Sequence, residues 1–153
     1  MAADARRLAA REQVAAMRAA FPQFRVLFES TWHVVWIGDL RPLRRTYRIR
    51  VAWTRPRKTK DFEVSTWSPK VWLIDPALEL TSARTPGERV PHIYYNPFNP
   101  AGSALCLFDP ATDEWNASMA VAATTIPWTI NWLATYEGWQ ATGEWTGGGR
   151  HPC

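Results

Sequence analysis

Between residues 25 and 64, stretches in which apolar side chains occupy alternate positions indicate a period of two, which most strongly constrains the fold. Such alternation is typical of strands that bury one face. Short polar turns containing Gly, Asp or Pro separate the alternating stretches, so consecutive strands are expected to pair as an antiparallel meander. The predicted strands are 26–36, 47–53, 71–74 and 90–95, with a loop over 81–89 before the last.

Both ends of the chain show the spacing of helices instead. Over residues 5–21, apolar side chains spaced 4-3-4-3 gather on one face. The same spacing returns over residues 119–137, where Pro127 either begins a second helix or kinks one. The predicted fold class is therefore α+β, with helices on one face of a four-stranded antiparallel meander. The domain is expected to span residues 1–153, with a flexible tail over about 140–153.

Composition supports a single globular domain. Hydrophobic residues make up 46% of the 153 residues and charged residues 21%, and ten tryptophans indicate a core rich in aromatic packing. No apolar run reaches the roughly 18 residues of a membrane span. The alanine-rich N-terminus carries charges of both signs, which a signal peptide would not. We therefore expect a cytoplasmic protein that has no membrane partner.

The chain contains two cysteines, Cys106 and Cys153. They are able to form one disulfide but not a disulfide framework. Because Cys153 is the last residue, where chains usually fray, the simpler interpretation is two free thiols in a reducing compartment. Only Cys106 is then well placed for chemistry.

Residues 41–60 carry nine of the eighteen Lys and Arg residues and no acidic residue. Such a run suits nucleic-acid phosphates or the acidic surface of a protein partner. The basic side chains also alternate with Tyr47, Ile49, Val51 and Trp53, which is the pattern of a strand with one solvated face. We favour the solvated face, and nucleic acid is the least expected of the three.

Cys106 lies between two leucines, after a loop rich in Pro, Asn and Gly, and His92 lies in the preceding predicted strand. A cysteine in this setting is often a buried small hydrophobic residue, and a histidine beside tyrosines is often structural. The alternative is a catalytic pair. The imidazole would lower the pKa of the thiol or donate a hydrogen bond to an oxyanion.

Other polar groups near this segment offer weaker candidates. Tyr94, Asp109 and Asp113 are possible auxiliary residues, and the aspartates are also typical turn residues with solvated carboxylates. A metal site would need Cys106, His92, His151 and Cys153, which lack the close ligand spacing of such sites. No glycine-rich phosphate loop and no GxSxG elbow occurs in the sequence.

The order of elements and the central motif resemble ubiquitin-conjugating enzymes. The residues that carry the resemblance are Val90-Pro91-His92-Ile93-Tyr94, Leu105-Cys106-Leu107, Trp115 and, near the first hairpin, Trp36-Ile37-Gly38. Two departures stand out. His92 takes the position of the family's oxyanion-stabilising asparagine, and the loop that leads to Cys106 is longer. The proline-rich segment of the family is also reduced to Ser68-Pro69.

His92 at that position and the tryptophan-rich stretch 126–145 are most similar to the bacterial branch, the stand-alone conjugating-enzyme-like proteins of CBASS antiphage operons. This resemblance implies that Cys106 forms a thioester with the C-terminus of a cGAS/DncV-like nucleotidyltransferase. It also implies transfer of that acyl group to a protein acceptor, with His92 stabilising the oxyanion or orienting the amine. No dedicated cofactor is implied.

Two rival hypotheses remain from the sequence. In the first, the chain is a catalytically silent adaptor that binds and regulates the nucleotidyltransferase, and it would be marked by a deeply buried Cys106. In the second, residues 41–60 form a basic nucleic-acid-binding module. The acyl-carrier hypothesis instead expects the sulfur of Cys106 to be reachable at the mouth of a shallow groove.

Overall fold

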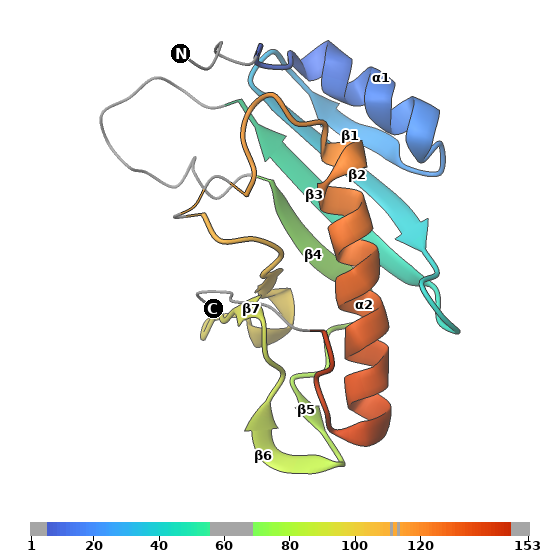
Figure 1. The fold of residues 1–153 in the computed structure, drawn as a ribbon, viewed down its shortest axis with the longest axis vertical. Coiled ribbons are helices and arrows are strands. Elements are labelled where there is room, and N and C mark those ends of the chain that lie inside the picture. Colours follow the sequence, from blue (N-terminus) through green and yellow to red (C-terminus); the bar gives the residue numbers. More distant parts are fainter. Residues whose placement is uncertain (1–5, 56–68, 111, 113, 148–153) are drawn as a thin grey trace.

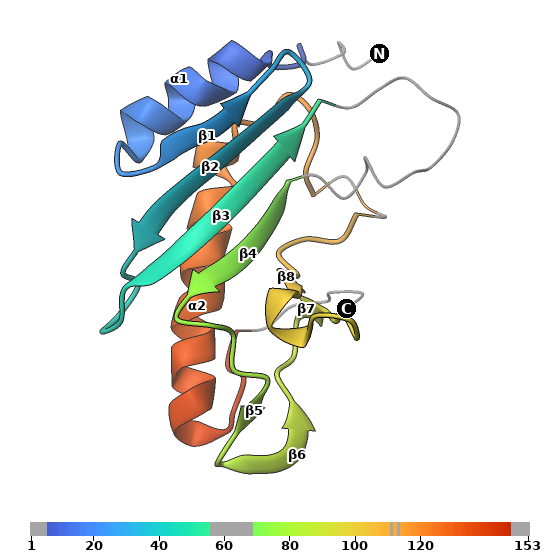
Figure 2. The ribbon, with the colours of Figure 1, turned by 180° about the vertical axis from the view of Figure 1, so that it is seen from behind.

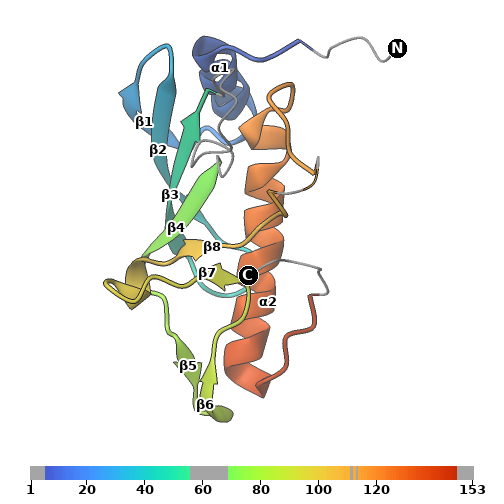
Figure 3. The ribbon, with the colours of Figure 1, turned by 90° about the vertical axis from the view of Figure 1, so that its left-hand side faces the viewer.

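The structure is a computed structural model that describes residues 6–55, 69–110, 112 and 114–147. Four antiparallel strands form the main sheet in the order β1-β2-β3-β4. Helices α1 and α2 both lie on one face of it (Figures 1 and 3). Figure 2 shows the opposite face, which neither helix covers. The predicted α+β class with a four-stranded meander is confirmed.

The main sheet consists of β1 (Arg25–Glu29), β2 (His33–Leu40), β3 (Tyr47–Thr54) and β4 (Lys70–Asp75). The alternation predicted for the second strand is confirmed in β3, where Tyr47, Ile49, Val51 and Trp53 are fully buried. The arginines between them face outward. Arg50 lies 4.6 Å from the centre of the Trp72 ring, and Arg48 pairs with Asp39 at 3.2 Å. This part of the basic run is therefore a solvated face, while residues 56–60 lie outside the described ranges.

Two of the strand predictions are wrong in detail. The stretch 26–36 is not one strand: it contains the end of β1 and the start of β2, because Ser30 makes a turn between them. The Ser30 hydroxyl accepts hydrogen bonds from the backbone N–H groups of Trp32 (3.2 Å) and His33 (3.0 Å). All five residues of β1 are exposed, so its apolar side chains do not mark a buried face. Because the stretch 26–36 gives two strands and not one, the sheet has four strands without the stretch 90–95. The prediction that 90–95 is the fourth strand of the sheet is therefore also wrong.

Two small hairpins follow the sheet. The predicted loop over 81–89 contains β5 (Thr81–Ser82) and β6 (Thr85–Arg89), which pair with each other. The stretch 90–95 contributes only β7 (Ile93–Tyr94), which pairs with β8 (Ala104–Leu105). Figure 3 shows this second hairpin between β4 and α2. His92 and Cys106 lie at its open end.

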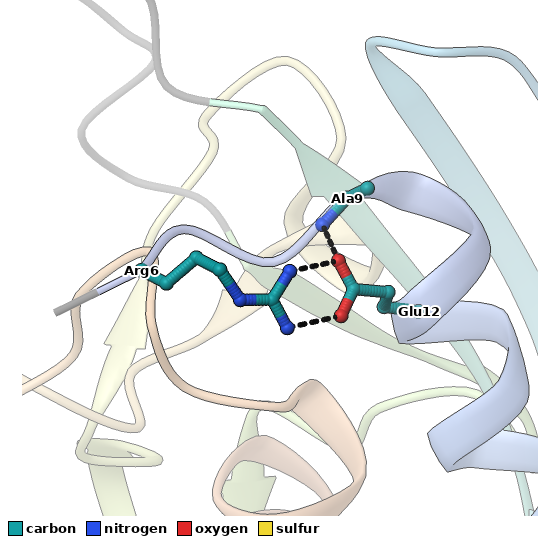
Figure 4. Close-up of polar contacts among 3 residues, drawn as sticks. All are labelled: Arg6, Ala9 and Glu12. Atoms are coloured by element: carbon teal, nitrogen blue, oxygen red, sulfur yellow. Dashed lines mark hydrogen bonds and ion pairs between the residues drawn. The ribbon is translucent and has the colours of Figure 1, made fainter.

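Helix α1 spans Ala10–Ala20 and buries Ala10, Gln13, Val14 and Met17, so it is shorter at its start than the predicted helix over 5–21. Its first turn is closed by the Glu12 carboxylate, which accepts a hydrogen bond from the backbone N–H of Ala9 at 3.1 Å (Figure 4). Arg6 donates two more hydrogen bonds to the same carboxylate, at 2.9 and 2.6 Å. These contacts lower the pKa of Glu12, with the Arg6 bonds as the larger cause.

Helix α2 spans Thr125–Thr142, and its buried residues are Thr125, Ile126, Thr129, Trp132, Leu133, Tyr136 and Trp139. The apolar stripe predicted over residues 119–137 is wrong in detail, because only Ile126 and Leu133 of it are buried and Ala123 is exposed. Pro127 is the third residue of this helix, in its first turn, where its missing N–H costs no hydrogen bond, and the helix begins at Thr125. The residues from Met119 onward do not yet belong to it, because only the short 3₁₀ turn η3 (Val121–Ala123) forms there. The sequence suggested several C-terminal helices, and the described residues form a single one.

The far end of α2 differs from the prediction as well. The helix continues past residue 140 and ends at Gly143, which has the left-handed φ of 82° that glycine adopts at low cost. The backbone N–H of Gly143 donates to the Trp139 carbonyl at 2.7 Å. Among the helices that the structure describes, none combines the length and apolar character needed to cross a membrane.

Candidate functional site

The β7–β8 hairpin brings His92 and Cys106 together. Ile93 pairs with Leu105, so the next residues outward in this register are His92 and Cys106. The backbone N–H of Cys106 donates to the His92 carbonyl at 3.0 Å. The sequence suggested that His92 lies inside a strand over 90–95, but His92 lies just before β7. The pairing of β7 with β8 thus brings His92 next to Cys106, as the sequence hypothesis of a catalytic pair required.

The loop between the two strands is fixed by Ser103, which is almost fully buried. Its hydroxyl donates to the Pro100 carbonyl at 2.7 Å and accepts from the backbone N–H of Asn96 at 2.9 Å. These bonds tie both ends of the Pro/Asn/Gly-rich loop together around the short 3₁₀ turn η2 (Pro100–Gly102). The loop thereby sets the register that places Cys106 opposite His92.

His92 has an unusual backbone conformation. Its φ is 57°, which lies in the left-handed region that side chains with a Cβ rarely adopt. The His92 carbonyl also accepts a hydrogen bond from the indole N–H of Trp132 at 2.9 Å. Trp132 thus anchors this turn to α2. This role is not evident from the sequence, because a tryptophan in an apolar helical segment is indistinguishable there from a core residue.

Cys106 is 1% exposed and disulfide-bonded, and none of the described cysteines is free. The expectation of a free thiol is therefore wrong for Cys106, and so is the expectation that its sulfur is open to solvent. The other cysteine of the sequence, Cys153, lies outside the described residues. In this state the sulfur is not a nucleophile, because the thiolate is the reactive form.

Cys106 and His92 nevertheless line a common cavity of about 230 Å³. Apart from Leu107, the other described residues that line it come from two parts of the chain. Helix α2 contributes Trp128, Asn131, Trp132 and Thr135, and the segment after α2 contributes Trp145 and Gly147. Among the described residues that line the cavity, none is a carboxylate, and His92 is the one with a basic side chain.

The auxiliary candidates lie elsewhere. Tyr94 lines a second cavity, of about 190 Å³, and its hydroxyl donates to the Phe108 carbonyl at 3.4 Å. Burial, followed by the charges of Asp109 and Glu114, raises the pKa of Tyr94. The Asp109 carbonyl accepts from the backbone N–H (3.1 Å) and hydroxyl (3.0 Å) of Thr112, as in a turn. Asp113 lies outside the described residues.

Within the described ranges, no group of three or more His, Cys, Asp or Glu side chains is arranged to hold a metal ion. Two members of the metal set considered from the sequence, His151 and Cys153, lie outside those ranges. Trp115, which the resemblance placed after the cysteine, is buried in the hydrophobic core.

Comparison with known proteins gives one family match. A family model described as "Type II CBASS E2 protein" matches residues 13–152, which is nearly the whole chain. No curated protein matches the sequence. The matched residues include α1 from Gln13 onward, both cavity walls and the hairpin that carries His92 and Cys106.

Proposed function

The chain belongs to the type II CBASS E2 protein family, an E2-like component of CBASS antiphage defence, and from this membership we propose that it carries an acyl group as a thioester on Cys106. The observation that carries the proposal is the pairing of Cys106 with His92 at one cavity. E2-like family membership favours a conjugating-type transferase, and that chemistry requires a cysteine beside a hydrogen-bond donor.

In the proposed reaction a cellular dithiol first reduces the disulfide of Cys106 with two electrons and two protons. The Cys106 thiolate then attacks the carbonyl carbon of an activated C-terminal residue of the donor. A carbon–sulfur bond forms and the leaving group of the activated carboxyl departs. The His92 imidazole donates a hydrogen bond to the oxyanion that develops during this attack.

In the second half of the reaction an amine attacks the thioester carbonyl. A carbon–nitrogen bond forms, the carbon–sulfur bond breaks, and the proton lost by the amine restores the thiol after passing through the imidazole or water. The proposed donor is the C-terminus of a CBASS cGAS/DncV-like nucleotidyltransferase, and the acceptor is a protein amine. Both assignments are consistent with the family, whose name places the protein in the same defence system.

One observation favours a second candidate, the silent adaptor. Cys106 is 1% exposed and bonded, as expected for a cysteine that serves structure and not catalysis. An adaptor would bind the nucleotidyltransferase through its surface and leave the sulfur unused. The two candidates differ in whether regulation of the nucleotidyltransferase requires the Cys106 sulfur.

Intact-mass measurement of the protein co-expressed with the nucleotidyltransferase of its operon tests the proposal. We expect a covalent adduct that hydroxylamine cleaves, that is absent from Cys106→Ala, and that persists in the matched control Cys153→Ser. Absence of any adduct from the reduced wild-type protein would reject the acyl carrier. If Cys106→Ala still raised nucleotide synthesis, the adaptor would be the better account.

A further inference from the structure

The chain folds back over the candidate site after α2. Gly143 reverses its direction, and the segment Glu144–Gly147 then runs alongside α2 toward the β7–β8 hairpin (Figures 1 and 3). Here we call Glu144–Gly147 the tail segment. Its second and fourth residues, Trp145 and Gly147, line the same cavity as Cys106. Its first and third residues are exposed, so the segment covers the site from the solvent side.

Trp145 makes the aromatic contacts of this cover. Its ring centre lies 5.3 Å from that of His92, with the planes tilted by 39°, and 5.3 Å from that of Trp132 in an edge-on arrangement. Contacts of this kind favour a defined position of the ring. The Trp145 side chain thus lies against the imidazole that the proposed reaction uses.

Gly147 fits a place that admits no side chain. A Cβ on this residue would lie 2.6 Å from the Thr135 hydroxyl oxygen and 3.0 Å from its methyl carbon. The Thr135 hydroxyl donates to the Asn131 carbonyl at 2.9 Å, which fixes its orientation. On the α2 wall of the cavity, the Trp132 ring packs against Trp145. Next to Thr135 there is room only for a residue without a side chain, and Gly147 occupies that place.

We propose that the tail segment is an autoinhibitory cover, which occupies the part of the cavity that the donor's C-terminal peptide must enter to reach Cys106. The tail competes with the donor by supplying an aromatic ring and a glycine to the same wall of α2. The competition with a donor rests on the proposed function, whereas the covering of the sulfur does not. Once the disulfide of Cys106 is reduced, displacement of the segment exposes both the sulfur and the imidazole.

Covering of the sulfur is tested by the rate at which iodoacetamide alkylates Cys106. All variants carry Cys153→Ser, so that Cys106 is the only thiol, and the reaction is followed by intact mass under reducing conditions. We expect Trp145→Ala to be alkylated about tenfold faster than the parent, because it loses both ring contacts. Thr146→Ala, an exposed neighbour in the same segment, should react at the parental rate. Equal rates for Trp145→Ala and the parent would overturn the proposal.

A compensating pair separates opening of the cover from unfolding. Gly147→Ala should also speed alkylation, by roughly threefold or more, because its Cβ collides with Thr135. Adding Thr135→Ala removes the colliding atoms and should restore slow alkylation in the double variant. Protection that is not restored, in a double variant that melts at the parental temperature, would reject the fit of the tail segment on α2.

Thioester formation by the same variants distinguishes the two proposals. Faster alkylation together with faster charging by the nucleotidyltransferase supports both. Faster alkylation without any thioester leaves the cover in place and rejects the acyl carrier. A thioester that forms on the parent and on Trp145→Ala at equal rates, with equal alkylation, rejects the cover and retains the acyl carrier.

Discussion

The left-handed turn at His92 makes a prediction that does not depend on the proposed chemistry. We compare His92→Gly with His92→Ala, which both remove the imidazole and its contact with Trp145. At a φ of 57° a Cβ costs about 1–2 kcal/mol. Glycine avoids that cost but loses about 0.5–1 kcal/mol through the greater freedom of the unfolded chain. The glycine variant should therefore be the more stable one, by about 0.5–1 kcal/mol.

For a domain of this size the difference corresponds to roughly 1–4 °C in melting temperature. Thermal unfolding followed by circular dichroism under reducing conditions measures it. The matched control is Ala15→Gly, on the exposed side of α1, where glycine should destabilise by about 1 kcal/mol. If His92→Ala were as stable as His92→Gly while the control behaved normally, the turn would not be strained and the reasoning would be refuted. Both variants should discharge a thioester more slowly than the wild type.

Three further predictions concern the scaffold. Gly38→Ala should destabilise the protein by about 1–3 kcal/mol, because the added Cβ would lie 2.6 Å from ring carbons of Phe24. Gly138→Ala, whose Cβ would have no described atom within 4 Å beyond its chain neighbours and the backbone of α2, should instead stabilise α2 by about 0.5–1 kcal/mol. Urea titrations of both variants measure the two changes. Gln13→Leu should lower the free energy of unfolding by about 2 kcal/mol or more, because the fully buried Gln13 amide donates to the Met119 carbonyl and accepts from the Val121 N–H. Chemical unfolding measures this loss. Burial raises the pKa of Tyr136 to about 12, so the stability gained from keeping its hydroxyl protonated is complete below pH 10 and is lost as the pH rises toward 12. Melting temperatures measured across this pH range should therefore fall less steeply in Tyr136→Phe than in the wild type.

The parts of the fold that follow from local alternation were predictable. In β3, every second residue from Tyr47 to Trp53 is buried, and the sequence shows this directly because a strand alternates its side chains between two faces. The break between β1 and β2 was not predictable in the same way. The alternation of Val26 and Phe28 in β1 resumes in phase at Trp32 in the turn and at Val34 in β2, so the short polar interruption at residues 29–31 is hard to distinguish from one continuous strand.

In the candidate site as well, contacts between residues close in the sequence were predictable and contacts between distant segments were not. Cys106 and His92 are close in sequence and belong to one hairpin, so motif and spacing sufficed to pair them. Trp132 and Trp145 reach the site from α2 and from the tail segment, through packing that local spacing does not encode. The burial of Cys106 likewise depends on what packs over the hairpin, and not on the residues beside it in the sequence.

Trp132 connects these long-range parts, and it does so through two different portions of its side chain. Its indole N–H holds the His92 carbonyl, while the edge-on contact of its ring supports Trp145. The hydrogen bond involves no atom of the tail segment, so departure of Trp145 leaves the strained turn anchored to α2. Because the tail segment is a short surface stretch, its release requires far less free energy than global unfolding. The site can therefore open while its left-handed turn, its register and the position of His92 beside Cys106 stay fixed.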